Sequence, residues 1–219
     1  MQTQLHFRVL VMLIAYLLLK FLGGSFGNLL LYPVTLLVTF LHEFGHAMGA
    51  ILTGGSVEGL HIDSDGSGYT ATRGGSPSII LVGGYLGSAI FGNILFRIGA
   101  KHHRLAQGTL LIMGAFMALA GLIWFESFES TLILWAFALS MAFIALRTTF
   151  DQDVLMFFGL AAVLYIIQDF NGGPSSDLAM FEKVMGLFPA QIWMYIWLGL
   201  AVLLTYWNMR GIFPRGLKF

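Results

Sequence analysis

The chain has 219 residues, of which 58% are apolar and 10% charged, and its formal net charge is zero. A soluble domain carries roughly 25% charged residues. Because the deficit extends along the whole length, the composition predicts a polytopic membrane protein. Zero net charge argues against a nucleic-acid partner. Cysteine is absent, which excludes disulfides and thiolate ligands and leaves His, Asp and Glu as metal ligands.

Seven apolar segments approach the length of about 20 residues that a membrane-spanning helix needs. In chain order they cover residues 7–22, 28–52, 78–98, 105–125, 131–146, 154–170 and 192–208. The first is short and contains Lys20, so it either tilts or starts inside the membrane. No small-residue cleavage site follows it, which favours a retained helix over a signal peptide. We therefore predict an all-α polytopic membrane protein with six to seven transmembrane helices, in one integral-membrane domain over residues 1–219.

A different texture separates the second and third segments. Residues 56–62 and 69–72 alternate loosely between apolar and polar side chains, and the residues between them, Asp63-Ser64-Asp65-Gly66-Ser67-Gly68, are turn-forming. This pattern is typical of a β-hairpin with a polar turn. We expect a small hairpin over residues 56–73.

The second apolar segment contains His42-Glu43-Phe44-Gly45-His46. On a helix, residues i and i+4 share one face, so His42 and His46 can bind one metal ion with Glu43 beside them as a base. The alternative is a pair of core histidines and a glutamate bonded to neighbouring helices. A buried carboxylate without a cation costs several kcal/mol, which favours a metal site.

A catalytic zinc takes three protein ligands and keeps one position open. Two aspartates, Asp169 and Asp177, are expected on the same side of the membrane as the hairpin. Asp177 follows a Gly-Gly-Pro break that can turn residues 176–188 back toward the core. Asp177 is the favoured third ligand. The alternatives are that Asp169 is the ligand or that neither aspartate binds the metal.

Basic residues follow the third, fifth and seventh segments, whereas the hairpin and the acidic stretch from Glu126 to Glu129 fall on the opposite side. The positive-inside rule then places the basic loops in the cytoplasm and the hairpin outside.

The stretch Leu41-His42-Glu43-Phe44-Gly45-His46-Ala47 on a membrane helix, followed by a hairpin and a Gly-rich third helix, resembles the site-2 protease family of intramembrane zinc metallopeptidases (peptidase family M50). Thr53-Gly54-Gly55, Asp65-Gly66-Ser67-Gly68 and Ser176-Asp177-Leu178-Ala179 resemble its compact M50B-like bacterial branch. The resemblance extends from about residue 29 to residue 200. It implies an integral protein of the bacterial cytoplasmic membrane, with a zinc that usually opens toward the cytosol. The family places the zinc on the cytosolic side of the membrane, whereas the charge distribution places the hairpin and the zinc motif near it on the outer side.

The resemblance also implies roles for individual residues. Zinc would be held by His42, His46 and a later aspartate, with Glu43 as catalytic base. Better-known members carry a substrate-binding asparagine in a G-P-x-x-N motif on the third helix. Here the corresponding stretch is Gly84-Tyr85-Leu86-Gly87-Ser88, which lacks both the proline and the asparagine. Gly84, Ser88 and Asn93 are therefore the expected substrate-binding residues.

These observations predict an intramembrane zinc endopeptidase that cleaves membrane-spanning or membrane-adjacent proteins in the lipid bilayer, and they leave room for a regulatory membrane partner. An edge strand of the hairpin would hold the substrate extended, with Tyr69 and Ala71 as backbone donors. The alternatives are a catalytically silent relative that binds membrane helices as an assembly or regulatory factor, and a metal transporter.

Overall fold

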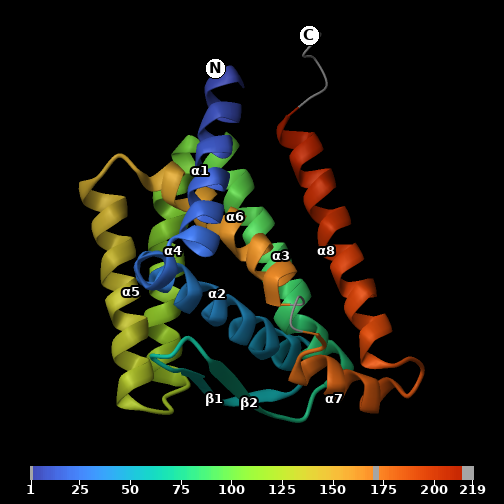
Figure 1. Ribbon diagram of the computed structural model, residues 1–219. Coiled ribbons are helices and arrows are strands. Elements are labelled where there is room, and N and C mark those ends of the chain that lie inside the picture. The colour runs from blue at the N-terminus through green and yellow to red at the C-terminus, as the bar shows by residue number, and fades with distance from the viewer. Residues whose placement is uncertain (1, 170–172, 214–219) are drawn as a thin grey trace.

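The computed structural model describes residues 2–169 and 173–213, without the side chains of residues 2, 3, 103 and 167–169. Within these residues the chain forms eight helices and one two-stranded sheet (Figure 1). In chain order they are α1 (Gln2–Leu22), α2 (Gly24–Leu52), β1 (Ser56–Ile62), β2 (Gly68–Arg73), α3 (Pro77–Lys101), α4 (His103–Ile123), α5 (Phe128–Arg147), α6 (Asp151–Asp169), α7 (Ser176–Met185) and α8 (Ala190–Ile212).

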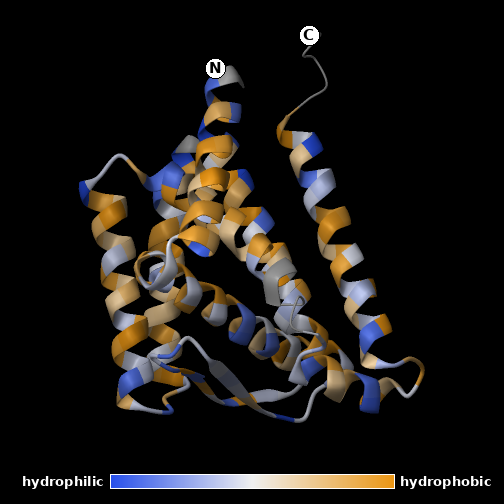
Figure 2. Cartoon of the chain, viewed as in Figure 1, coloured by the Kyte–Doolittle hydropathy of each residue, from blue (hydrophilic) through white to orange (hydrophobic). Residues whose placement is uncertain are grey.

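Among the described residues, six helices are long and apolar enough to cross a membrane: α1, α2, α3, α4, α5 and α8. Figure 2 shows these helices hydrophobic along most of their lengths, with hydrophilic residues near the ends of the bundle and in the half of α2 next to the hairpin. The prediction of an all-α polytopic membrane fold with a hairpin between the second and third helices is confirmed. Helix α6 covers the predicted segment 154–170 up to Asp169, and residue 170 lies outside the described residues.

The N-terminal end of α1 and the C-terminal end of α8 lie at the same end of the bundle, opposite the hairpin (Figure 1). Helices α1 and α2 therefore lead in the same overall direction, toward the hairpin, instead of forming an antiparallel pair. The chain bends between them at Gly24, whose φ of +53° suits glycine. Arg8 of α1 pairs with Asp153 at the start of α6, which fixes the outer part of α1 to the bundle.

The basic ends of α3, α5 and α8, at Lys101, Arg147 and Arg210, also lie opposite the hairpin (Figure 1). Glu126 and Glu129 lie at the hairpin end, where they accept hydrogen bonds from the Tyr69 hydroxyl and the Ser64 amide. The separation of charge expected from the sequence is therefore present. Which end faces the cytoplasm stays a prediction.

Helices α2 and α3 pack with their backbones in contact. A Cβ on Gly45 would lie 2.1 Å from the carbonyl oxygen of Gly83, and one on Gly83 would lie 2.4 Å from the oxygen of Gly45. Small residues permit this approach in membrane helix pairs. It brings the N-terminal third of α3 directly against the HExxH turn of α2.

The hairpin lies below α2, and its two strands pair antiparallel, with Leu60 opposite Thr70 and Ile62 opposite Gly68 (Figure 1). The outer edge of β1 is closed by the α4–α5 connection and by the first turn of α5. The Leu60 amide donates to the Trp124 carbonyl at 3.2 Å, and the Ile62 amide donates to Ser130 Oγ at 2.9 Å. The sheet is thus held from one side.

Candidate metal centre

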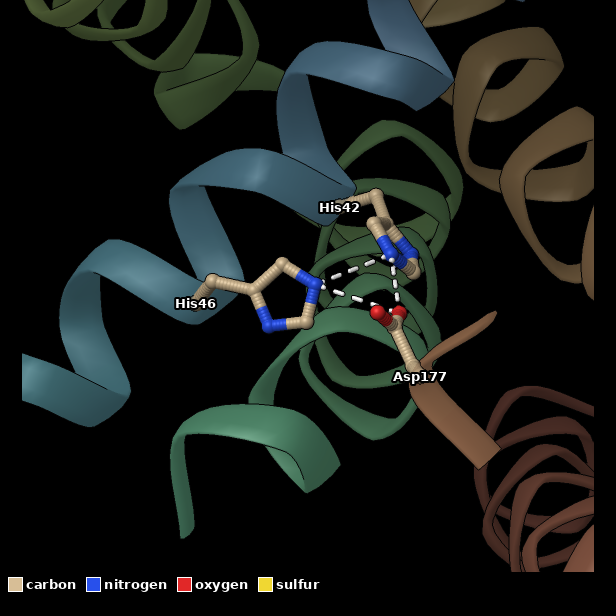
Figure 3. Close-up of side chains that lie close together, drawn as sticks. All are labelled: His42, His46 and Asp177. Carbon is tan, nitrogen blue, oxygen red and sulfur yellow. Dashed lines mark hydrogen bonds and ion pairs between the residues drawn. The ribbon is translucent and has the colours of Figure 1, made fainter. Parts of the chain in front are cut away.

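Three side chains from two distant parts of the chain converge at the hairpin end of α2 (Figure 3). His42 and His46 lie one turn apart on α2, and Asp177 lies in the first turn of α7. Asp177 Oδ2 is 2.9 Å from His42 Nε2 and 3.3 Å from His46 Nε2, and the two histidine nitrogens are 3.1 Å apart. The ligand atoms of these three residues therefore form a nearly equilateral triangle.

This triangle fits a tetrahedral metal ion. Zinc–nitrogen and zinc–oxygen bonds of about 2.0–2.1 Å at tetrahedral angles separate neighbouring ligand atoms by about 3.3 Å. The observed separations of 2.9–3.3 Å are close to that value. A His₂–carboxylate set is one that catalytic zinc uses, and it leaves a fourth position for water or substrate.

The orientation of His46 is fixed from the far side of its ring. Its Nδ1 donates to the backbone carbonyl of Ile80 at 2.7 Å. This bond leaves the Nε2 lone pair of the neutral ring directed at the site. A metal-binding histidine usually donates its other ring N–H to a carbonyl or carboxylate in this way. The ring of His42 meets the ring of Tyr85 edge to face, with centroids 4.6 Å apart.

Gly84 of α3 lies directly against both imidazoles. A Cβ at this position would lie 2.6 Å from His46 Nε2 and 2.7 Å from His42 Cε1. Both rings occupy the space that any other residue would fill. The backbone of Gly84 has no left-handed φ that would call for glycine. Glycine is required here only because the two rings lie so close.

Glu43 is buried, at 5% exposure, on the same turn of α2. Its carboxylate Oε2 accepts a hydrogen bond from the Thr70 hydroxyl of β2 at 2.8 Å, and its own carbonyl oxygen lies 2.9 Å from the same hydroxyl. The hairpin therefore positions the carboxylate of Glu43.

The Asp177 carboxyl is ionised in this setting. Burial by itself would raise the pKa of Asp177, but its close polar contacts with the imidazoles of His42 and His46 outweigh burial and hold that pKa well below its ordinary value. The carboxylate form is the one that binds metal. Asp169, the other candidate ligand, ends α6, but its side chain lies outside the described side chains.

A cavity of about 200 Å³ opens beside the cluster. Its walls come from α2, the hairpin turn, α3 and α6: Val38, Thr39, His42, Glu43, Gly66, Ser67, Gly68, Tyr85, Ser88, Tyr165 and Ile166. His42 and Glu43 thus reach a space large enough for water and part of a peptide, next to the start of β2.

The three expected substrate-binding residues lie in different places. Gly84 contacts the histidine rings, and Ser88 lines the cavity while its hydroxyl donates to the Gly84 carbonyl at 2.8 Å. Asn93 is not with them. Its amide donates to Thr205 Oγ1 of α8 at 3.0 Å and its Oδ1 accepts from Asn208 at 2.9 Å, so it joins α3 to α8.

Sequence reasoning missed three residues that support the site, namely Thr70, Ile80 and Tyr85. Ile80 acts through a backbone carbonyl and leaves no side-chain signal. Thr70 was visible only as one polar residue in an alternating strand. Their contacts with α2 depend on tertiary packing.

Comparison with known proteins agrees with this geometry. A family model described as Peptidase M50B-like matches residues 8–208. The chain belongs to this family. M50 peptidases are zinc metalloproteases of the site-2 protease type, and membership together with the apolar helices identifies this M50B-like chain as an integral membrane protein. No curated protein and no solved structure matches the chain significantly.

Proposed function

We propose that this M50B-like protein is an intramembrane zinc endopeptidase that hydrolyses membrane-spanning or membrane-adjacent proteins. The observation that supports the proposal most directly is the convergence of His42, His46 and Asp177, together with the cavity that both His42 and Glu43 line. A site that only binds protein helices would not need a metal-ligand triangle next to a buried carboxylate.

Metal binding and proton transfer fall to different residues of the chain. When bound by His42, His46 and Asp177, zinc supplies a Lewis acid that activates water and polarises the scissile carbonyl. Glu43 faces the cavity with its carboxylate held by Thr70, so it is placed to accept the proton from water and pass it to the leaving amine.

Residue substitution separates this function from that of a silent relative. Glu43→Gln preserves size and removes the proton carrier, so it should keep stoichiometric zinc and reduce cleavage by roughly 10²–10⁴-fold. Zinc content and cleavage of a membrane-protein substrate measured side by side provide the test. If the wild-type protein holds zinc but cleaves no membrane substrate, the catalytically silent alternative is favoured.

We also propose that the substrate adds as a strand to the outer edge of β2. The Leu60 and Ile62 amides point away from β2, and the Asp63 amide donates to the Ser67 carbonyl across the turn. Along an antiparallel strand, the backbone N–H and C=O groups of successive residues point alternately toward the partner strand and away from it. The outward groups of β2 are therefore those of Gly68, Thr70 and Thr72.

This alternation corrects the expectation from the sequence. Tyr69 and Ala71 stand opposite His61 and Gly59, and their backbone groups face β1. Proline at either position would break the hairpin pairing and would not test the open edge. The open edge begins at Gly68, which lines the cavity beside Glu43.

Thr72→Pro is the sharper test because it removes an outward-facing donor. We expect it to lower the cleavage of a helical substrate while zinc content stays unchanged. Thr72→Val is the matched control, since it changes the side chain and keeps the backbone amide. Equal cleavage rates for both variants would refute strand addition at this edge.

A further inference from the structure

The third candidate ligand lies on an element that does not span the membrane. Helix α7, with 10 residues, lies across the hairpin end of the bundle, and α8 rises from its far end (Figure 1). Isolated helices shorter than about 12–15 residues are marginal in water. The position of Asp177 therefore depends on what α7 packs against.

One side of α7 packs on the protein. Leu178 and Phe181 are buried, and the Phe181 ring meets the rings of Trp193 and Trp197 of α8 with centroids 4.9 Å and 5.0 Å apart. The Ala190 amide at the start of α8 donates to Glu182 Oε2 at 2.9 Å. These contacts fasten α7 to α8.

A second apolar side of α7 has no protein cover among the described residues. Met180 is 54% exposed and Val184 is 46% exposed, and the chain continues with exposed Leu187 and Phe188. Asp177, Met180 and Val184 are spaced i, i+3 and i+7, so they share one face of the helix. Met180 and Val184 thus form an exposed apolar strip that adjoins the largely buried Asp177.

The lipid bilayer is the occupant that fits this face. Exposed apolar residues recur beyond Leu187 and Phe188 in the first turns of the membrane helix α8, at Ile192, Tyr195 and Ile196. Tyrosine and other aromatic residues are enriched where helices cross the membrane–water boundary. An amphipathic helix at that level places its apolar face among the upper acyl chains.

We propose that the exposed side of α7 formed by Met180 and Val184 lies in the bilayer interface, and that this lipid contact holds Asp177 beside His42 and His46. The inference rests on the proposed metal site. It makes the completeness of the ligand set depend on the membrane, because lipid then holds the exposed side of α7 while α3 and α8 hold its buried side.

The lipid contact is tested first, without metal or substrate. Because the chain contains no cysteine, Val184→Cys and Lys183→Cys each provide a single labelling site for a bimane fluorophore. In phosphatidylcholine vesicles with nitroxide-labelled lipids, we expect strong quenching at position 184 and weak quenching at position 183. Equal quenching at both positions overturns the proposal. Protection of position 184 from aqueous iodide without lipid quenching would assign the face to a protein partner and also overturn it.

The coupling to the ligand set is tested by zinc affinity, measured by competition with a chelating dye in vesicles. Val184→Gln should weaken zinc binding about tenfold, the lower end of the loss caused by removing a contact that supports a metal ligand. Val184→Leu and Lys183→Gln, which keep the apolar face, should bind as the wild type does. Unchanged affinity for Val184→Gln refutes the coupling. Neither readout uses a peptide, so absence of proteolysis would leave both results interpretable.

Discussion

Gly84→Ala tests the geometry of the metal centre with the smallest change that the chain allows. The added methyl carbon would lie 2.6 Å from both Cε1 and Nε2 of His46 and 2.7 Å from Cε1 of His42. Nonbonded carbon atoms settle near 3.5 Å, so the rings would have to retreat by about 0.9 Å. Ligand distances at a metal tolerate only about ±0.2 Å.

The rings have little freedom to retreat. His46 is held by its 2.7 Å hydrogen bond to the Ile80 carbonyl. Helices α2 and α3 cannot shift along each other freely because the Gly45 and Gly83 backbones are already in contact. We therefore expect zinc affinity to fall by at least about 100-fold, the upper end of the loss found for disturbed supporting contacts. A displacement of about 1 Å likewise costs about 100-fold in turnover, or about 2.7 kcal/mol.

The fold itself should survive, because alanine is favoured over glycine in a helix by up to about 1 kcal/mol. Zinc content, zinc affinity and the melting temperature of the metal-free protein are the measurements. Gly199→Ala in α8 is the matched control, since no atom beyond its own stretch of helix backbone lies within 4 Å of the added methyl group. Wild-type zinc affinity in Gly84→Ala would show that the ring positions described here are wrong.

Three further outcomes are expected. Thr70→Val removes the hydroxyl that donates to Glu43, so cleavage should fall about 10-fold or more while zinc binding is kept. If Thr70→Val cleaved at the wild-type rate, the contact between the hairpin and Glu43 would have no role in catalysis. Ser130→Ala leaves the buried Ile62 amide without its acceptor and should lower the free energy of unfolding by about 1–3 kcal/mol, measured by denaturant or thermal unfolding. Chelation of zinc should lower the melting temperature of the wild type and leave that of Gly84→Ala unchanged, since only a bound metal contributes linkage stability.

Local spacing was enough to predict much of the candidate site. The i, i+4 geometry of a helix places His42 and His46 on one face wherever α2 lies, and Glu43 follows from the same turn. The membrane class followed from composition, and the hairpin followed from alternation around a Gly-rich turn. These properties depend on neighbours within a few residues, which a sequence displays directly.

Contacts between distant segments depended on the tertiary structure. Asp177 is 135 residues from His42, and its arrival at the site depends on how α7 packs against α3 and α8. Gly84 was expected to contact substrate, which stays a prediction, and its place against both imidazoles could not be read from the sequence because it depends on the close approach of α2 and α3. Asn93 bonds to α8 for a similar reason.

The direction of α1 and the open edge of the sheet were likewise decided by packing. A strand exposes backbone groups on both edges. Only the contacts of Leu60 and Ile62 with Trp124 and Ser130 show that, among the described residues, β2 is the strand with an open edge. The sequence by itself determined the chemistry of the site, because ligand types and helical spacing are local. The tertiary structure decided which distant carboxylate lies beside the histidines and which strand edge borders the cavity, because those choices depend on contacts that no local pattern encodes.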